Sequence, residues 1–131
     1  MNLNKLKSDF KILVVEDDFI INMFIEDVLV NHGYSVVDVV INGKDAVDKV
    51  REHKPDLVIM DIGLKGEMNG IEAACLICEQ SQTNIIFMTG NSDILSQDSR
   101  LDKVQPIATF LKPMNDFKLI QHLEQLFPEY Q

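Results

Sequence analysis

Short apolar runs alternate with helical patterns along the whole chain, and this alternation limits the fold more than any other feature. Five short runs predict buried strands: KILVV (11–15), YSVVDVV (34–40), DLVIM (56–60), NIIFM (84–88) and IATFL (107–111). Patterns with the helical period lie between and after these runs, at about 18–32, 44–54, 70–81, 92–104 and 116–127. Strands that alternate with helices pair in parallel, because right-handed crossovers return each strand to the same sheet. The sequence therefore predicts an α/β doubly wound parallel sheet with helices on both faces.

The length of the chain fits one domain with one core. The sequence has 131 residues, of which 46% are hydrophobic, and it shows no internal repeat, low-complexity tract or linker. We expect the domain to span 11–127, with an N-terminal tail at 1–10 and a C-terminal tail at 128–131. We also expect a protein that acts by itself, since a Met1 start and a polar PEYQ end flank this domain.

Charge and composition argue against several classes of protein. A formal net charge of −9 and a pI near 4.6 disfavour direct nucleic-acid binding, which depends on clustered Lys and Arg. No apolar run reaches the length of a membrane span, and the start MNLNKLKSDF lacks the apolar core of a secretory signal. We therefore expect a cytoplasmic protein that contacts neither nucleic acid nor membranes. Cys75 and Cys78 lie inside a predicted helix, and we interpret them as core packing rather than a redox or zinc site.

Polar side chains follow the predicted strands. In doubly wound sheets, ligands bind at the carboxyl ends of the strands. The informative residues expected at that edge are Glu16, Asp17, Asp18, Asp61, Thr89 and Lys112. Crowded carboxylates repel one another unless a cation shares them. The pattern therefore indicates a cation site at this edge of the sheet.

These residue types suit magnesium-dependent phosphoryl chemistry. Asp17 and Asp61 offer hard oxygen ligands for Mg²⁺, and Glu16 is suited to hold a metal-bound water. Asp61 is also a candidate nucleophile, because carboxylates form acyl phosphates. Lys112 and the Thr89 hydroxyl are suited to bind phosphate oxygens. Taken singly, each acid is better explained as a helix cap or a solvated loop residue, and Lys112 as a surface charge, but this alternative weakens because the set follows successive strands.

At these residues the sequence resembles the response-regulator receiver domains of two-component signalling. The motifs are Glu16-Asp17 after ILVV, Asp61 after DLVIM, Thr89 in FMTG and Lys112-Pro113 in FLKP, and the resemblance covers about 11–127. It implies a flavodoxin-like sheet in the strand order 2-1-3-4-5 with five helices. It further implies that Asp61 accepts a phosphoryl group from a phosphohistidine on a sensor histidine kinase or a histidine phosphotransfer protein. Such a protein dephosphorylates slowly and is not a turnover enzyme.

The resemblance also assigns roles to the residues around Asp61. Mg²⁺ ligands would come from Asp17, Asp61 and the carbonyl of Gly63, with Glu16 bound through water. Thr89 and Lys112 would bind the phosphate. The peptide bond between Lys112 and Pro113 would be cis, a state that proline makes accessible.

Two positions depart from the family pattern. Lys65 stands where many receivers have proline, in the long loop DIGLKGEMNG, which we expect to alter loop mobility rather than chemistry. Thr109 stands three residues before Lys112, where the family usually has Tyr or Phe, and strand alternation sends the neighbouring Phe110 to the opposite face. In the family, the phosphate-bound threonine moves inward and the ring follows it. We hypothesise that Thr89 still moves here but that the output surface responds differently.

The first predicted helix, at 18–32, has apolar residues on two sides. The side expected to face the core carries Ile21, Phe24, Ile25, Val28 and His32. Phe19 and Met23 lie on the opposite side, where the resemblance favours docking of the phosphoryl donor, and a covering loop is the alternative. The polar helix at 92–104 is expected to be the most mobile and, with the fifth strand and helix, to form the output face.

Three other functions stay open. The strongest is a receiver-like module that binds partners without phosphorylation, which the missing ring at Thr109 favours. A magnesium-dependent aspartyl-phosphate phosphatase would share the nucleophile, but Gly63 stands where its DxD pattern has the second acid. A flavodoxin-type electron carrier would share the topology, but three acids after the first strand would repel the flavin phosphate.

Overall fold

The predicted strands form one parallel sheet. The computed structural model describes residues 5–90 and 99–131. Its strands are β1 (Lys11–Val15), β2 (Ser35–Val40), β3 (Leu57–Asp61), β4 (Asn84–Thr89) and β5 (Ala108–Leu111), and they pair in the order β2-β1-β3-β4-β5. The predicted fold class and strand order are therefore confirmed. β3 and β4 run one residue further than predicted, so that Asp61 and Thr89 are the last residues of their strands.

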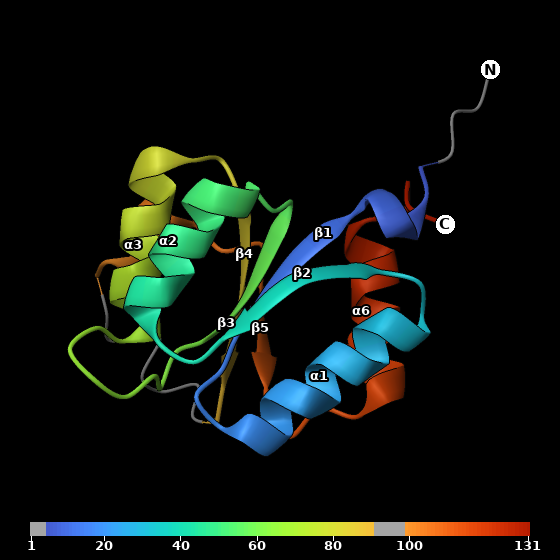
Figure 1. Ribbon diagram of the computed structural model, residues 1–131, viewed down its shortest axis with the longest axis horizontal. Coiled ribbons are helices and arrows are strands. Elements are labelled where there is room, and N and C mark those ends of the chain that lie inside the picture. Colours follow the sequence, from blue (N-terminus) through green and yellow to red (C-terminus); the bar gives the residue numbers. More distant parts are fainter. Residues whose placement is uncertain (1–4, 91–98) are drawn as a thin grey trace.

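Helices cover both faces of the sheet (Figure 1). On one face lie α1 (Phe19–Asn31) and α6 (Asp116–Leu126), and on the other lie α2 (Gly43–His53), α3 (Gly70–Gln80) and α5 (Leu101–Val104). A short 3-10 helix, η1 (Lys7–Asp9), precedes β1. A helix was expected at 92–104, and within the described residues it is represented by α5. The mobility predicted for this helix concerns mainly positions 92–98, which lie outside the described residues. None of the helices in the described ranges is long and apolar enough to cross a membrane.

The sheet divides the apolar interior into two layers. The length of the chain had predicted one core. Ile12 and Val14 of β1 pack in the layer under α1 and α6, and Leu13 and Val15 pack in the layer under α2 and α3. All four side chains are at most 1% exposed. A strand buried on both faces has a continuous apolar sequence rather than an alternating one, and such strands hold the polar residues at their ends in a fixed frame.

Asparagine side chains define where three helices begin beside the carboxyl edge of the sheet. Asn42, Asn69 and Asn115 each accept a hydrogen bond from the backbone N–H three residues on, at the starts of α2, α3 and α6. Asn69 forms a capping box with Glu72, whose side chain accepts the backbone N–H of Asn69 in return. These caps satisfy backbone donors that a helix start leaves unpaired, so the helices begin at defined positions next to the strand ends.

Lys5, the first described residue, and Tyr130 lie side by side at the amino edge of the sheet (Figure 1). The backbone N–H of Lys5 donates to the carbonyl oxygen of Glu129 at 2.9 Å. Phe10 is 1% exposed, and its ring centroid lies 4.7 Å from that of Phe127 and 4.5 Å from that of Tyr130. Residues 5–10 and 129–131 therefore pack against the domain and against each other.

Candidate functional site

Four strand ends bring polar side chains together at the carboxyl edge of the sheet. Asp61 and Thr89 end the neighbouring strands β3 and β4, whereas Glu16 and Asp17 follow β1 and Lys112 follows β5. Three of these residues are almost fully buried: Glu16 is 2% exposed, Asp61 is 6% exposed and Thr89 is 3% exposed. The structure thus places all five of these predicted site residues at one edge, with three of them buried.

Lys112 joins the two buried carboxylates. Its Nζ donates to Oε1 and Oε2 of Glu16 at 3.1 and 3.0 Å, and it lies 3.1 Å from Oδ1 of Asp61. The backbone N–H of Lys112 donates to the carbonyl oxygen of Thr89 at 2.8 Å, which fixes the lysine to the end of β4. Asp17 lies in the same group of acids, so three carboxylates cluster around a site in which Lys112 contacts two of them, and the fully ionised group has an excess of negative charge.

Burial changes the proton affinities of this group. Burial, assisted by the neighbouring Asp61 carboxylate, raises the pKa of Glu16 from 4.5 to about 7, although the Lys112 ammonium acts in the opposite direction. Burial alone would lower the pKa of Lys112, but its hydrogen bonds to Glu16 and Asp61 raise that pKa above the usual value. Lys112 is therefore charged at neutral pH, whereas Glu16 gains or loses its proton near neutral pH.

The loop between β3 and α3 contacts the acids through two backbone amides. The N–H of Gly63 donates to Oδ1 of Asp61 at 3.0 Å, and the N–H of Lys65 donates to Oδ2 of Asp17 at 3.1 Å. Such charge-assisted hydrogen bonds help to fix the orientation of a carboxylate. From the sequence, Gly63 was expected to contribute its carbonyl oxygen and Lys65 to change the mobility of the loop. The hydrogen bonds that their backbone N–H groups donate were not predicted. A signal for the second donor was present, because lysine has a backbone N–H that proline lacks.

The first residue of α3 lies so close to Asp61 that it has to be glycine. A Cβ on Gly70 would lie 2.1 Å from the carbonyl oxygen of Asp61, far inside contact distance. The N–H of Gly70 donates to the carbonyl oxygen of Ile62 at 3.0 Å. The loop at 62–69 therefore returns to the strand end that it left, which keeps its amides beside the acids.

Glu16, Asp17 and Asp61 fit a hard divalent cation. One carboxylate oxygen of each residue lies within 4.8 Å of the others. This spacing allows one ion to contact two oxygens directly and the third through water. The donors are carboxylate oxygens, which Mg²⁺ prefers, and the excess of negative charge around Lys112 favours a further cation at the same place.

Asp18 has a different role from its two neighbours. Its Oδ1 accepts hydrogen bonds from the N–H groups of Ile20 and Ile21 at 2.9 and 3.2 Å, so that Asp18 is the N-cap of α1. The helix-cap explanation is therefore correct for this one acid of the sequence EDD. Glu16 and Asp17 instead belong to the acidic cluster.

The buried face of α1 agrees with its periodicity in part, since Val28 is buried and Ile21 packs against the core as predicted, but His32 is exposed. Ile25 is buried as expected, but Phe24 is 42% exposed and the polar Asn22 is 4% exposed. Asn22 Nδ2 donates to the backbone carbonyl of Glu16 at 3.0 Å. Hydropathy gave no signal for Asn22, because its burial depends on a backbone acceptor at the end of β1.

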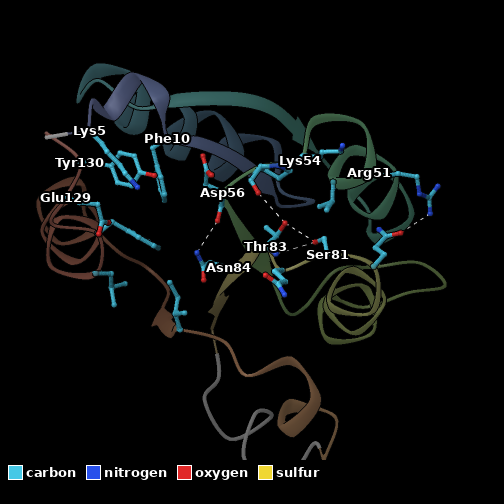
Figure 2. Close-up of a pocket in the computed structure, with 17 residues that line it drawn as sticks. Lys5, Phe10, Arg51, Lys54, Asp56, Ser81, Thr83, Asn84, Glu129 and Tyr130 are labelled. Atoms are coloured by element: carbon cyan, nitrogen blue, oxygen red, sulfur yellow. Dashed lines mark hydrogen bonds between the residues drawn. The ribbon is translucent and has the colours of Figure 1, made fainter. Parts of the chain in front are cut away.

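Two cavities lie at opposite ends of the molecule. A wide one, of about 1020 Å³, opens at the amino edge between α6 and the ends of α2 and α3, and Figure 2 shows Lys5, Asp56, Asn84 and Tyr130 along it. Several of its polar groups bond to one another, as where Asn84 Nδ2 donates to the carbonyl of Asp56 at 3.3 Å. None of the predicted site residues is among its described lining residues. The second cavity, of about 360 Å³, lies between α1 and the segment after β5, and Lys112 is part of its wall.

Comparisons with known proteins agree with the geometry of the carboxyl edge. The family model of the response regulator receiver domain matches residues 12–124. The chain belongs to the response regulator receiver family. It is 49% identical over 109 residues to the chemotaxis protein CheY of Bacillus subtilis, a match that covers 72% of this chain and 90% of that protein.

Two further relatives of this receiver show how far the likeness extends. A protein-glutamate methylesterase/protein-glutamine glutaminase of Archaeoglobus fulgidus is 37% identical over 79 residues, and the match covers 60% of this chain but only 22% of that protein. The solved signal receiver domain of a modulated diguanylate cyclase from Desulfovibrio desulfuricans has a TM-score of 0.78 and 30% identity, over 88% of this chain and 90% of that chain. The likeness therefore concerns about a fifth of the Archaeoglobus protein but nearly all of the solved receiver domain.

The end of β5 matches the predictions made for this receiver. The Lys112–Pro113 peptide bond is cis, as the family resemblance implied. Thr109 is exposed and Phe110 is 4% exposed, so the alternation predicted for β5 is confirmed. The ring of Phe110 stacks on His122 of α6 with 5.0 Å between centroids. The aromatic side chain thus belongs to the α1 and α6 side of the sheet.

Proposed function

We propose that this receiver is the phospho-acceptor of a two-component system or phosphorelay, with Asp61 as the acceptor and Mg²⁺ as the cofactor. The observation that carries the proposal is the burial of Asp61 against the Lys112 ammonium, beside the oxygen donors of Glu16 and Asp17. The donor is a phosphohistidine on a sensor histidine kinase or a histidine phosphotransfer protein. A cytoplasmic location, without direct contact to nucleic acid or membrane, is part of the proposal.

In the proposed reaction a carboxylate oxygen of Asp61 attacks the phosphorus atom. An O–P bond forms as the N–P bond of the phosphohistidine breaks, and the imidazole nitrogen leaves with the electron pair. Lys112 and Thr89 stabilise the charge on the phosphoryl oxygens. Asp17, Asp61, the Gly63 carbonyl and, through water, Glu16 would hold Mg²⁺, which would supply further neutralisation of that charge. The resulting acyl phosphate hydrolyses slowly, so the protein carries a signal and does not turn over a substrate.

The donor is proposed to dock on α1. Phe19 and Met23 are 71% and 47% exposed on this helix. The cavity of about 360 Å³ beside them is lined by apolar residues that include Phe24 and Met114, and it reaches Lys112 of the acid site. An apolar partner surface that covers this area therefore lies next to the phosphoryl acceptor.

The signal is proposed to leave through the surface around the predicted fourth helix, β5 and α6. Thr89 and Thr109 are the switch positions, and Thr109 offers no ring to follow a movement of Thr89. We expect Thr89 still to move and the output surface to respond differently from that of a receiver with Tyr or Phe at this position. Backbone amide shifts of β4 and β5, recorded with and without a phosphoryl mimic, test this, and unchanged shifts would contradict it.

Intact mass after incubation with acetyl phosphate tests the proposal. We expect one phosphoryl adduct on the wild type in the presence of Mg²⁺ and none without it. Asp61→Asn keeps the size of the side chain but removes the nucleophilic carboxylate, and it should show no adduct. An adduct of equal amount on Asp61→Asn would contradict the assignment of the acceptor.

A receiver-like module that works without phosphorylation is the second candidate. The exposed Thr109 favours it, because the usual coupling between phosphate and output surface lacks its ring. This function predicts no adduct under any condition, even when Mg²⁺ binding has been shown separately. The same mass measurement therefore distinguishes the two candidates.

A further inference from the structure

The loop between β3 and α3 donates a hydrogen bond to Asp17 that was not predicted from the sequence. The backbone N–H of Lys65 donates to Oδ2 of Asp17 at 3.1 Å, although the two residues are 48 positions apart in the sequence. Lys65 is exposed and Asp17 is half-buried. The bond thus connects the loop that follows the phosphoryl acceptor to the acid that follows β1.

The side chains on either side of Asp17 have other partners. Glu16 is bound to Lys112, and Asp18 caps α1. For the carboxylate of Asp17, the Lys65 amide is the hydrogen-bond donor recorded among the described residues. A carboxylate has several rotamers of similar energy when nothing fixes it, and one charge-assisted N–H bond selects among them.

The identity of residue 65 matters here through its backbone rather than its side chain. Any residue except proline has an N–H that can bind Asp17, and proline stands at this position in many receivers. Proline would also bias the preceding Leu64, which is 5% exposed, toward an extended backbone. A chain with lysine therefore has a contact to the acid that a chain with proline cannot form.

We infer that the Lys65 amide is a positioning group for Asp17 as a ligand of Mg²⁺. The amide fixes the orientation of the carboxylate and offsets part of its repulsion with Glu16 and Asp61, so the oxygen set is organised before the ion arrives. By linkage, the bound ion in turn stabilises the loop at 62–69. The inference rests on the magnesium part of the proposed function.

Two substitutions at one position separate the backbone effect from the side-chain effect. Lys65→Pro removes the N–H, and Lys65→Ala removes the ammonium but keeps the N–H. Titration calorimetry with MgCl₂ should give a Kd for Lys65→Ala within about twofold of the wild type, whereas Lys65→Pro should bind about tenfold more weakly, as is typical when a group that orients a metal ligand is lost. Equal Kd values for the proline variant and the wild type would overturn the inference. A wild type that binds no Mg²⁺ would overturn the proposed cofactor itself, and the inference with it.

Hydrogen exchange of the Lys65 amide in the wild type tests the same idea without a substitution, in case the proline variant does not fold. We expect Mg²⁺ to slow this exchange at least severalfold, because the ion fixes the acceptor carboxylate. Asp17→Ala, which removes the acceptor, should exchange faster than the wild type and should not respond to Mg²⁺. Exchange that is unchanged or faster in the Mg²⁺-bound wild type would show that the ion does not strengthen the bond, and would overturn the inference.

Discussion

At the amino edge of the sheet, charged groups meet partners of opposite sign or backbone donors, whereas at the carboxyl edge three carboxylates cluster and Lys112 contacts two of them. Lys7 pairs with Glu124 at 3.1 Å and also lies 5.1 Å from the ring centroid of Tyr34. Asp56 accepts the backbone N–H of Lys11 at 2.8 Å. At the other edge, Lys112 is divided between Glu16 and Asp61, and Glu16 has a raised pKa.

The amino edge therefore contributes to the stability of the fold, whereas the carboxyl edge carries the proposed chemistry. Paired charges and the aromatic cluster around Phe10 hold residues 5–10 and 129–131 together. Buried carboxylates in excess destabilise the folded state unless a cation binds, and such local conflicts are expected where a protein functions. Substitutions at the amino edge should therefore change folding and spare ion binding, and those at the carboxyl edge should do the reverse.

The largest effect on stability is expected at the amino edge. Phe10 is 1% exposed and contacts three aromatic rings, so Phe10→Ala should lower the free energy of unfolding by about 3–5 kcal/mol. Urea titration measures this, and the Kd for Mg²⁺ should not change. Phe117→Ala is the matched control, because Phe117 is 70% exposed and its loss should cost less than about 0.5 kcal/mol. A similar loss in both variants would contradict the distinction.

The next effect is stabilisation by Mg²⁺ at the carboxyl edge. At a concentration of 100 times Kd, the ion should raise the free energy of unfolding by about 2.7 kcal/mol, because it binds the folded state alone. Asp17→Asn should lose most of this gain, Asp61→Asn should lose part of it, and Phe10→Ala should keep it. Equal stabilisation of all four proteins in urea titrations with MgCl₂ would remove the basis of the metal site.

The pH dependence of Mg²⁺ binding comes third. Between pH 4.5 and about 7, folded Glu16 holds a proton that the unfolded chain has released, so its contribution to metal-free stability falls as pH rises through this window. Mg²⁺ competes with the same proton, and its affinity should rise up to about tenfold per pH unit below pH 7 and level off above it. Calorimetric titrations between pH 5.5 and 8.5 (roughly one and a half units either side of the pKa) measure this. Glu16→Gln should flatten the profile, and an equally steep profile in that variant would assign the proton to another group.

The smallest effect is expected at the docking surface. Phe19→Ser and Met23→Ser should slow phosphoryl transfer from a histidine-containing protein donor by about threefold to tenfold, because exposed apolar contacts contribute modestly to binding. Phosphorylation by acetyl phosphate should not change. Val30→Ser, near the far end of the same helix and 53% exposed, is the control and should leave both rates unaltered. Equal losses with both donors would place these residues in the acid site rather than on a docking surface.

The sequence predicted those features that follow from chain order and hydrophobic period. Alternating strands and helices determined the sheet, and the parallel sheet in turn placed Glu16, Asp61 and Lys112 at one edge, because parallel strands end on the same side. Residues whose roles depend on backbone approach were not predicted. Asn22 is buried because the carbonyl oxygen of Glu16, just after β1, accepts a hydrogen bond from its side chain, and Gly70 is required because α3 begins against Asp61.

The end of β5 shows a further reason why some contacts could not be predicted from the sequence. Strand alternation correctly separated Thr109 from Phe110, since the period of a strand is local. The partner of Phe110, by contrast, is His122 on a later helix, and helical periodicity does not say which ring on α6 meets which residue of β5. Pairings across elements depend on packing distances that a one-dimensional pattern does not contain.

The central claim is that the carboxyl edge directs a phosphoryl group to Asp61 and to no other acid. After incubation with acetyl phosphate and Mg²⁺, borohydride reduction converts an aspartyl phosphate to homoserine, and peptide mass spectrometry locates the converted residue. We predict homoserine at position 61 in the wild type and no conversion when Mg²⁺ is omitted. Homoserine at Asp17 or at Asp56 of the amino edge, or equal conversion without Mg²⁺, would contradict the claim.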